Sequence, residues 1–247
     1  NHIKKTKYQT KYLIRNKKDL SIKKSDIINF SLEKGFPKIN IPPSTTLIHL
    51  AWGNVRKPND KNHLNNELDI QFEFLKQAVS RGIEKIIVAG SCYEYGLVFG
   101  PIDINYPTNP ITYYGKAKMK LYERLKNLQL EKKFNLLWTR IFYLYGDDDN
   151  AGNIISIFDE AVRNGNKKFP MTQGEQLLDY LHVSDVAKKI IKLIELKNGT
   201  YNICSGNPIS IRRFIEERRK KKKSNIQLEI GKYPYRDNES LAFWGVP

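Results

Sequence analysis

The sequence predicts an α/β fold, in which a doubly wound parallel sheet is followed by a smaller carboxyl-terminal domain. Short apolar runs alternate with amphipathic helical segments along the chain, and no internal repeat or low-complexity linker interrupts them. Strands separated by helices form right-handed crossovers, which make a sheet parallel. With 247 residues, the chain is long enough to bury a sizeable core.

The expected strands are six short apolar runs, at residues 8–14, 26–30, 46–50, 85–89, 135–139 and 200–203. The run at 85–89 is followed by a glycine, which is typical of a buried parallel strand. The expected helices lie between the strands, at residues 64–81, 113–132, 153–164 and 183–196. Leu121, Leu125 and Leu128 supply apolar positions in the second of these helices. We expect residues 1–147 to form the sheet domain and 148–247 most of the small domain, with about 183–204 returning to the main sheet.

Three polar residues near the middle of the chain predict acid/base chemistry. Tyr114 and Lys118 are four residues apart in the helix expected at 113–132, so both lie on one face. Ser91 follows the strand at 85–89, and open α/β sheets bind ligands at the carboxyl ends of their strands. An ammonium group near a phenol favours the phenolate, so we expect Lys118 to lower the pKa of Tyr114 from about 10. Such a set is suited to oxidising an alcohol or reducing a ketone.

The order of these motifs resembles the extended short-chain dehydrogenases/reductases that act on nucleotide sugars. The resemblance runs over nearly the whole chain and continues through 46–52 (TLIHLAW), 138–146 (WTRIFYLYG), 179–187 (DYLHVSDVA) and 199–206 (GTYNICSG). It implies a Rossmann-type sheet that binds a nicotinamide cofactor. In this family the segments 46–52 and 138–146 correspond to the fourth and sixth strands.

The resemblance also implies the residues of the site. The catalytic residues are Ser91, Tyr114 and Lys118. The cofactor contacts are Arg15, Leu50, Ala51, Trp52, Ala89, Gly90, Tyr114, Lys118, Ile141 and Phe142. The substrate contacts are Ser91, Cys92, Tyr93, Tyr143, Asn153 and Arg236. No metal site is expected.

The amino end departs from the family pattern. The family opens with a strand and a Gly-x-x-Gly-x-x-Gly turn, whose backbone approaches the cofactor pyrophosphate. This sequence begins at Asn1 without that turn, and residues 7–14 resemble the family's second strand. We therefore expect the first strand to be absent, with a gap in the sheet between the second and fourth strands and weakened cofactor affinity.

Arg15 predicts the cofactor. The second strand ends beside the adenosine ribose in this architecture, and a carboxylate there would bind the free 2′-hydroxyl of NAD. This strand ends with Arg15 and Lys17 instead. An arginine can pair bidentately with a 2′-phosphate, so we expect NADP, with NAD as the alternative.

Cys92 and Tyr93 narrow the class of reaction within the family. Sugar dehydratases of the family place Asp-Glu at these positions, and a cysteine and a tyrosine cannot supply the acid and base for water elimination. Segments 90–96 and 171–180 resemble instead the reductases that act on the 4-keto group of a nucleotide-diphospho-6-deoxy sugar. A nucleotide-sugar 4-epimerase uses the same residues and remains an alternative. A catalytically silent nucleotide-binding protein, left without the glycine-rich turn, is the second alternative.

The net charge of +16 comes from lysines spread along the chain, and it suits a substrate that carries a diphosphate. The densest run, 218–223, is expected to be a solvated helix end rather than a nucleic-acid site. No apolar run approaches the roughly 20 residues of a membrane span. The two cysteines, Cys92 and Cys204, form no disulfide framework, which favours the cytoplasm. The resemblance further implies a homodimer.

Overall fold

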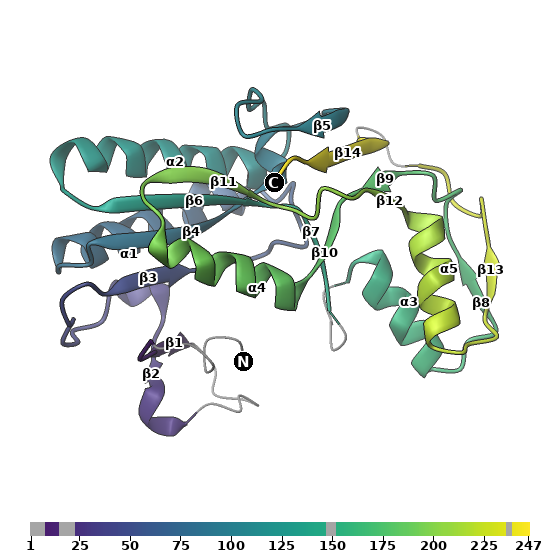
Figure 1. The fold of residues 1–247 in the computed structure, drawn as a ribbon, viewed down its shortest axis with the longest axis horizontal. Helices are drawn as coiled ribbons and strands as arrows, with labels where there is room; N and C mark the ends of the chain where they lie inside the picture. The colour runs from purple at the N-terminus through teal and green to yellow at the C-terminus, as the bar shows by residue number, and fades with distance from the viewer. Residues whose placement is uncertain (1–7, 15–22, 147–151, 236–238) are drawn as a thin grey trace.

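The structure is a computed structural model that describes residues 8–14, 23–146, 152–235 and 239–247. Its centre is a parallel sheet of four strands in the order β11-β6-β4-β3 (Figure 1). These strands are β3 (Thr46–His49), β4 (Lys85–Ser91), β6 (Asn135–Ile141) and β11 (Gly199–Ile203). Arg15 and Arg236, two of the expected contact residues, lie outside the described residues.

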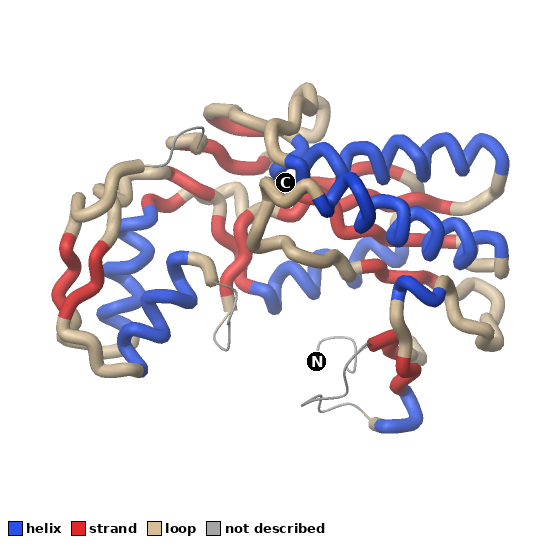
Figure 2. Tube along the Cα trace, turned by 180° about the vertical axis from the view of Figure 1, so that it is seen from behind, coloured by secondary structure: helices blue, strands red, loops and turns tan. Residues whose placement is uncertain are grey.

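Helices cover both faces of this sheet. On one face, α1 (Leu68–Ser80) and α2 (Tyr113–Glu131) lie side by side, as Figure 2 shows from behind. On the other face lies α4 (Val183–Lys192), which continues into the 3₁₀ turn η6 (Leu193–Glu195). Successive side chains of a strand alternate between the two faces of the sheet. Because helices cover both faces, the strands are buried on both sides. Ile86 and Val88 pack with α1 and α2, whereas Ile87 packs with α4.

The amino-terminal strands form a separate parallel pair. β1 (Tyr12–Ile14) bonds to β2 (Ile27–Asn29), and these two strands lie beyond β3 in Figure 1. Within the described residues, β3 bonds to β4 and to no strand on its other side. The 3₁₀ turns η2 (Lys24–Asp26) and η3 (Leu32–Lys34) flank β2.

The carboxyl-terminal lobe has a core of its own. Phe158, Phe169 and Ile215 are buried in it, and it is continuous with Cys92, Tyr95 and Phe142 at the end of the sheet. Its helices are α3 (Ile154–Arg163) and α5 (Ile211–Lys221). Short strands complete the lobe and its junction with the sheet: β5 (Gly100–Ile102), β7 (Tyr143–Tyr145), β8 (Lys168–Pro170), β9 (Leu177–Leu178), β10 (Tyr180–His182), β12 (Ile209–Ser210), β13 (Gln227–Glu229) and β14 (Ala242–Gly245).

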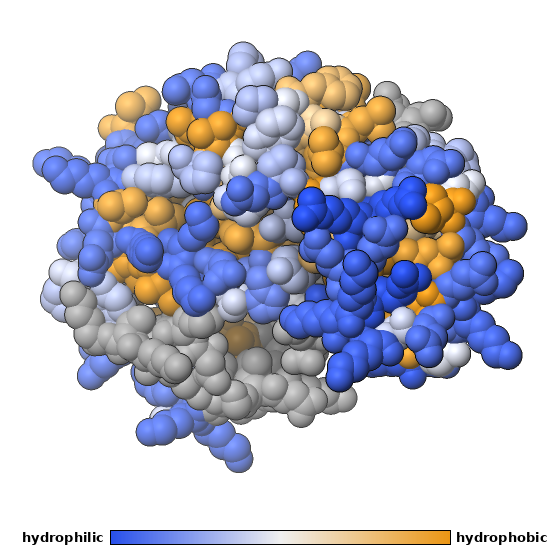
Figure 3. Space-filling view, turned by 45° about the vertical axis from the view of Figure 1, so that its right-hand side comes forward, coloured by the Kyte–Doolittle hydropathy of each residue, from blue (hydrophilic) through white to orange (hydrophobic). Residues whose placement is uncertain are grey.

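The α/β fold class and the parallel sheet predicted from the sequence are confirmed. All six expected strands and all four expected helices form, with ends that shift by a few residues. The short strands of the lobe were not predicted, because runs of two or three residues carry no readable periodicity. The basic run at 218–223 is the end of α5, but it is not wholly solvated: Arg218 is 6% exposed and paired with Asp159. Elsewhere hydrophilic side chains are spread over the surface, as one face shows in Figure 3.

Candidate functional site

The three residues predicted to be catalytic meet at the carboxyl end of the sheet. Ser91 is the last residue of β4, and Tyr114 and Lys118 lie in the first two turns of α2. Thr112 begins this helix by accepting a hydrogen bond from the backbone N–H of Gly115 at 3.1 Å. Tyr114 and Lys118 therefore share the face that α2 turns towards β4.

Two glycines allow the approach of α2 to the Ser91 turn. A Cβ atom at Gly115 would lie 2.5 Å from the carbonyl oxygen of Tyr93, so a larger residue would push the helix away. Gly96 has a φ of 82°, and a Cβ atom there would lie 2.0 Å from the carbonyl oxygen of Asn109. The backbone N–H of Tyr114 also donates to the carbonyl oxygen of Pro58, at 2.9 Å.

Ser91 begins the short 3₁₀ turn η5 (Cys92–Glu94), in which a capping box fixes its backbone. The Ser91 hydroxyl accepts from the N–H of Tyr93 at 3.2 Å, and the Glu94 carboxylate accepts from the N–H of Ser91 at 2.7 Å. The spacing Ser-x-x-Glu is the usual sequence signature of this motif, so the sequence already carried the signal.

Glu94 is buried beneath Ser91 and has a structural role. Its carboxylate also accepts from the indole N–H of Trp138 and from Nε of Arg140, each at 3.0 Å. Burial raises the pKa of Glu94, and the ion pair with Arg140 opposes that shift. A carboxylate engaged with three N–H donors in the core does not face the reaction site.

Tyr114 differs from its prediction in one respect. Burial raises the pKa of its phenol above the usual range, and a hydrogen bond with the Ser91 hydroxyl opposes the shift. The expected net lowering of this pKa is wrong, because burial outweighs the effect of the Lys118 charge. Nζ of Lys118 lies 5.7 Å from the centre of the Tyr114 ring, within the range at which a positive charge favours a phenolate.

Lys118 is 2% exposed and is held by two neutral groups. Its Nζ donates to the carbonyl oxygen of Ala89 at 2.6 Å and lies 3.8 Å from the ring centre of Trp52. Burial lowers the pKa of Lys118 to about 7, while the charges of Glu94 and Glu67 oppose the shift. The ammonium group is therefore close to losing its proton at neutral pH.

Trp52 and His63 form the wall next to this lysine. The indole N–H donates to Nδ1 of His63 at 3.1 Å, and Nε2 of His63 lies 3.0 Å from the carbonyl oxygen of Lys57. An indole nitrogen can only donate, so Nδ1 of His63 is the acceptor and Nε2 carries the proton. His63 is fully buried and opens the π-helical turn η4 (His63–Glu67) before α1. Such turns are rare and often occur at functional sites.

A second buried histidine lies under the same lysine. His49, the last residue of β3, bonds to Gln71, whose amide donates to Glu67. Burial and the nearby charge of Lys118 lower the pKa of His49 to about 4, so the imidazole is neutral near pH 7. Neither His49 nor His63 was singled out from the sequence, because their roles depend on contacts between separate elements.

The remaining expected cofactor positions differ in accessibility. Leu50 is 59% exposed and Ala51 is exposed beside it, at the carboxyl end of β3. A Cβ atom at Gly90 would lie 2.4 Å from the Trp138 indole, so internal packing explains this glycine. Ile141 is half-buried at the end of β6, whereas the Phe142 side chain lies in the core of the lobe.

The expected substrate positions within the described residues differ in what they contact. Tyr93 is 36% exposed and meets the Tyr114 ring edge-on, with 5.9 Å between ring centres. Tyr143 packs against Tyr180, which the sequence did not single out. The Cys92 thiol is buried in the core, which raises its pKa and excludes a reactive thiolate. Asn153 caps α3, where its side-chain oxygen accepts from Ser156 at 2.9 Å.

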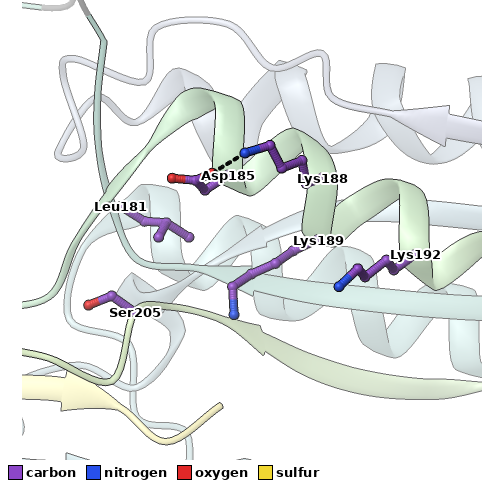
Figure 4. A pocket seen from close by; sticks show the side chains of 6 residues that line it. All are labelled: Leu181, Asp185, Lys188, Lys189, Lys192 and Ser205. Atoms are coloured by element: carbon purple, nitrogen blue, oxygen red, sulfur yellow. Dashed lines mark hydrogen bonds and ion pairs between the residues drawn. The ribbon is translucent and has the colours of Figure 1, made fainter. Parts of the chain in front are cut away.

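A separate pocket of about 350 Å³ lies on the other face of the sheet, on α4 (Figure 4). Its lysines are Lys188, Lys189 and Lys192, and Asp185 pairs with Lys188 at 2.7 Å. The pocket contains none of the acid/base residues. In the described parts of the chain, no helix combines the length and apolar character needed to cross a bilayer. No group of three or more metal-binding side chains occurs among these residues either.

Comparisons with known proteins place these features in context. The family model described as "NAD dependent epimerase/dehydratase family" matches residues 6–204. A dTDP-6-deoxy-L-talose 4-dehydrogenase (NAD(+)) from Aggregatibacter actinomycetemcomitans is 34% identical over 224 residues, which cover 90% of this chain and 82% of that protein. A CDP-abequose synthase from Yersinia pseudotuberculosis is 27% identical, covering 86% of this chain and 74% of that protein.

Solved structures share the fold. A UDP-N-acetylglucosamine 4-epimerase from Methanobrevibacter ruminantium M1 superposes with a TM-score of 0.74 at 21% identity, over 81% of this chain and 67% of that chain. RMD from Pseudomonas aeruginosa, complexed with NADPH, gives a TM-score of 0.72 at 20% identity, over 81% of this chain and 71% of that chain.

Proposed function

The chain belongs to the NAD-dependent epimerase/dehydratase family, and we propose that it reduces the 4-keto group of a nucleotide-diphospho-6-deoxy sugar. The observation that carries this proposal is the meeting of Ser91, Tyr114 and Lys118 at the carboxyl end of the sheet. The relative from Aggregatibacter, whose printed name specifies a 6-deoxy-talose substrate, supports the choice of sugar.

Each residue has a separate role in this reaction. A bound reduced nicotinamide cofactor would supply the hydride for C4 of the sugar. Tyr114 then gives its phenolic proton to the oxygen on C4, so that a ketone becomes an alcohol. Ser91 donates a hydrogen bond to the same oxygen, and the positive charge of Lys118 stabilises the phenolate that Tyr114 leaves behind. The raised pKa of Tyr114 suits this direction, because the phenol carries the required proton at neutral pH.

The position of Glu94 supports a reductase over a dehydratase. Elimination of water needs a second acid and base beside the sugar, and Cys92 and Tyr93 stand where dehydratases place them. Glu94, the nearest carboxylate along the chain, is engaged with Arg140 and Trp138 in the core. A 4-epimerase remains the second candidate, since several relatives bear that name and the same residues serve it.

The residues at the sheet edge fit a nicotinamide cofactor. Lys118 and Tyr114 supply a cation and a phenol suited to ribose hydroxyls, and Leu50 and Ala51 leave the end of β3 open. Arg15 favours NADP, by the pairing of a guanidinium with a 2′-phosphate. The printed name of the Aggregatibacter relative specifies NAD(+), so NAD is the alternative.

The proposal extends to the organisation of the protein. Residues 1–147 are the proposed cofactor domain and 148–247 most of the substrate domain, with about 183–204 returning to the main sheet. Tyr93, Tyr143, Asn153 and Arg236 are the proposed side-chain contacts of the sugar, and Cys92, whose thiol is buried, can contribute only its backbone. Cys92 and Cys204 are both free and buried, which suits a reducing cytoplasm. The protein acts as a homodimer, by analogy with its family.

Two measurements test the proposed function. The full-length protein is incubated with a dTDP-4-keto-6-deoxy sugar and NADPH or NADH, and the product is identified by mass spectrometry. A gain of two hydrogens with loss of reduced cofactor supports the reductase. In a parallel incubation with a nucleotide-diphospho sugar that carries a 4-hydroxyl, conversion to the C4 epimer without net change in cofactor supports the epimerase. Arg15→Ala is expected to weaken NADPH by roughly 1.5–3 kcal/mol and to leave NADH unchanged. Equal weakening of both cofactors would contradict NADP recognition by Arg15.

A further inference from the structure

Lys118 occupies an unusual position for a buried cation. Among the described residues it forms no ion pair, although it is 2% exposed. Its ammonium group contacts the Ala89 carbonyl oxygen at 2.6 Å and the face of the Trp52 ring at 3.8 Å. A desolvated ammonium over an indole face gains more from the ring than an exposed one does.

We propose that Trp52 is a positioning residue, whose indole face holds the ammonium group of Lys118 in its charged form beside Ala89. This inference rests on the proposed function, because it takes the role of Lys118 in the reaction from it. Trp52 acts through Lys118, which in turn acts on Tyr114.

The orientation of the indole is fixed by its own contacts. Its N–H donates to the buried His63, and its ring edge packs against Tyr114 with 6.0 Å between ring centres. His63 lies 5.3 Å from the Tyr114 ring and enters the site through the widened turn η4. Because the hydrogen bond fixes one edge of the indole, the π face stays turned towards Nζ of Lys118.

The titratable groups around Lys118 come from several elements. His49 of β3, Glu67 of η4, Glu94 of η5 and Tyr114 of α2 interact with it, and His63 of η4 contacts Trp52 and Tyr114. Glu67 and Glu94 favour the charged lysine, but both engage other donors, and burial outweighs them. His49 is neutral near pH 7, since its pKa is lowered to about 4. The Trp52 face, together with the Ala89 carbonyl oxygen, therefore offsets part of the cost of desolvation.

The first experiment measures the contact without substrate or cofactor. The fluorescence of Trp52 is obtained in the full-length, ligand-free protein by subtracting the emission of Trp52→Phe, because Trp138 and Trp244 also emit. A titration is expected to show a transition near pH 7, where Lys118 loses its proton. Lys118→Met, which keeps the length and volume of the side chain, is expected to abolish the transition. Its persistence in Lys118→Met, or its absence from the wild type, would overturn the inference.

The second experiment measures the consequence for turnover. In Trp52→Leu the ammonium group of Lys118 no longer contacts an aromatic ring, so its pKa is expected to fall further. The alkaline limb of the pH profile of kcat is therefore expected to move about one pH unit lower. Trp52→Phe keeps a π face and is expected to shift the limb much less. Equal profiles for Trp52→Leu and the wild type would also overturn the inference. If the wild type has no turnover, the proposed function fails, while the fluorescence titration still decides whether Trp52 holds Lys118.

Discussion

The sheet domain and the carboxyl-terminal lobe both bury cations, and two of them, Lys118 and Arg218, are held in opposite ways. In the lobe, Arg218 of α5 is 6% exposed and pairs with Asp159 of α3 through Nε at 2.7 Å and through NH2. Lys222 lies 3.3 Å from the same carboxylate. In the sheet domain, Lys118 is 2% exposed and contacts a carbonyl oxygen and an aromatic ring.

The difference separates a structural cation from a reactive one. A buried carboxylate partner returns much of the free energy lost when a guanidinium leaves water, and it fixes two helices in register. A carbonyl oxygen and an indole ring offset less of the free energy that an ammonium group loses on burial than a carboxylate does. Burial therefore lowers the pKa of Lys118 to about 7. A group near neutrality in a ligand site is suited to acid/base chemistry, whereas a fully paired group is not.

The largest expected effect concerns activity at the reactive site. In Tyr114→Phe the phenolic proton is lost, so turnover is expected to fall by about 10²–10⁴-fold, with little change in nucleotide-sugar binding. Tyr113→Phe is the matched control, since its ring packs under Lys116 and its hydroxyl is not needed in the mechanism. Steady-state kinetics and calorimetry measure the two quantities. Near-normal turnover in Tyr114→Phe would show that Tyr114 does not donate the proton, and Lys118 would then no longer belong to a reactive site.

The structural cation is tested by Arg218→Met, which leaves the Asp159 carboxylate buried without its arginine. The free energy of unfolding is expected to fall by about 3–5 kcal/mol, as measured by urea denaturation. Arg213→Met, at an exposed pair with Glu217, is the control and is expected to cost at most about 0.5 kcal/mol. Arg218→Met combined with Asp159→Leu is expected to recover most of the loss. Equal stability of the Arg218 and Arg213 variants would show that burial does not distinguish the two pairs.

The buried His49 is expected to make the stability of the sheet domain sensitive to acid. The pKa of His49 is lowered from 6.5 to about 4 by burial, so the unfolded chain binds its proton first. The stability that the neutral His49 contributes to the folded chain is fully present above about pH 6.5. It is lost as the pH falls towards 4, by up to about 3 kcal/mol of the free energy of unfolding. His49→Gln retains a donor to Gln71 and is expected to flatten this part of the pH dependence. An unchanged profile in the variant would assign the acid sensitivity to other groups.

Lys118→Met gives the smallest expected change and the sharpest contrast with Arg218→Met. Because folding lowers the pKa of Lys118 from 10.5 to about 7, burying its charge costs stability at low pH. The variant is expected to be more stable by roughly 1–3 kcal/mol at pH 6, and the gain shrinks as the pH rises from 7 towards 10.5. Urea denaturation at pH 6 and pH 9 measures this. A large loss of stability would show that Lys118, like Arg218, has a mainly structural role.

Much of this architecture was readable from the sequence, because its signals are local. Hydrophobic periodicity located β3, β4, β6, β11 and the helices between them, and helical spacing placed Tyr114 and Lys118 on one face. Ser91 at a strand end joined them because the carboxyl ends of parallel strands share one edge of the sheet. These inferences need only the period of each element and the direction of its strand.

The tertiary structure decided the environment of those residues. The sequence predicted that Lys118 lowers the pKa of Tyr114, but in the folded chain the lysine turns towards Ala89 and Trp52, and burial raises the phenol's pKa. Asp159 and Arg218 are 59 residues apart, and no periodicity relates them. Desolvation and pairing depend on which side chains meet from separate elements. The sequence alone therefore determined that Ser91, Tyr114 and Lys118 meet at the end of the sheet. Packing determined their charge and direction, and it added His49 and His63 to the site.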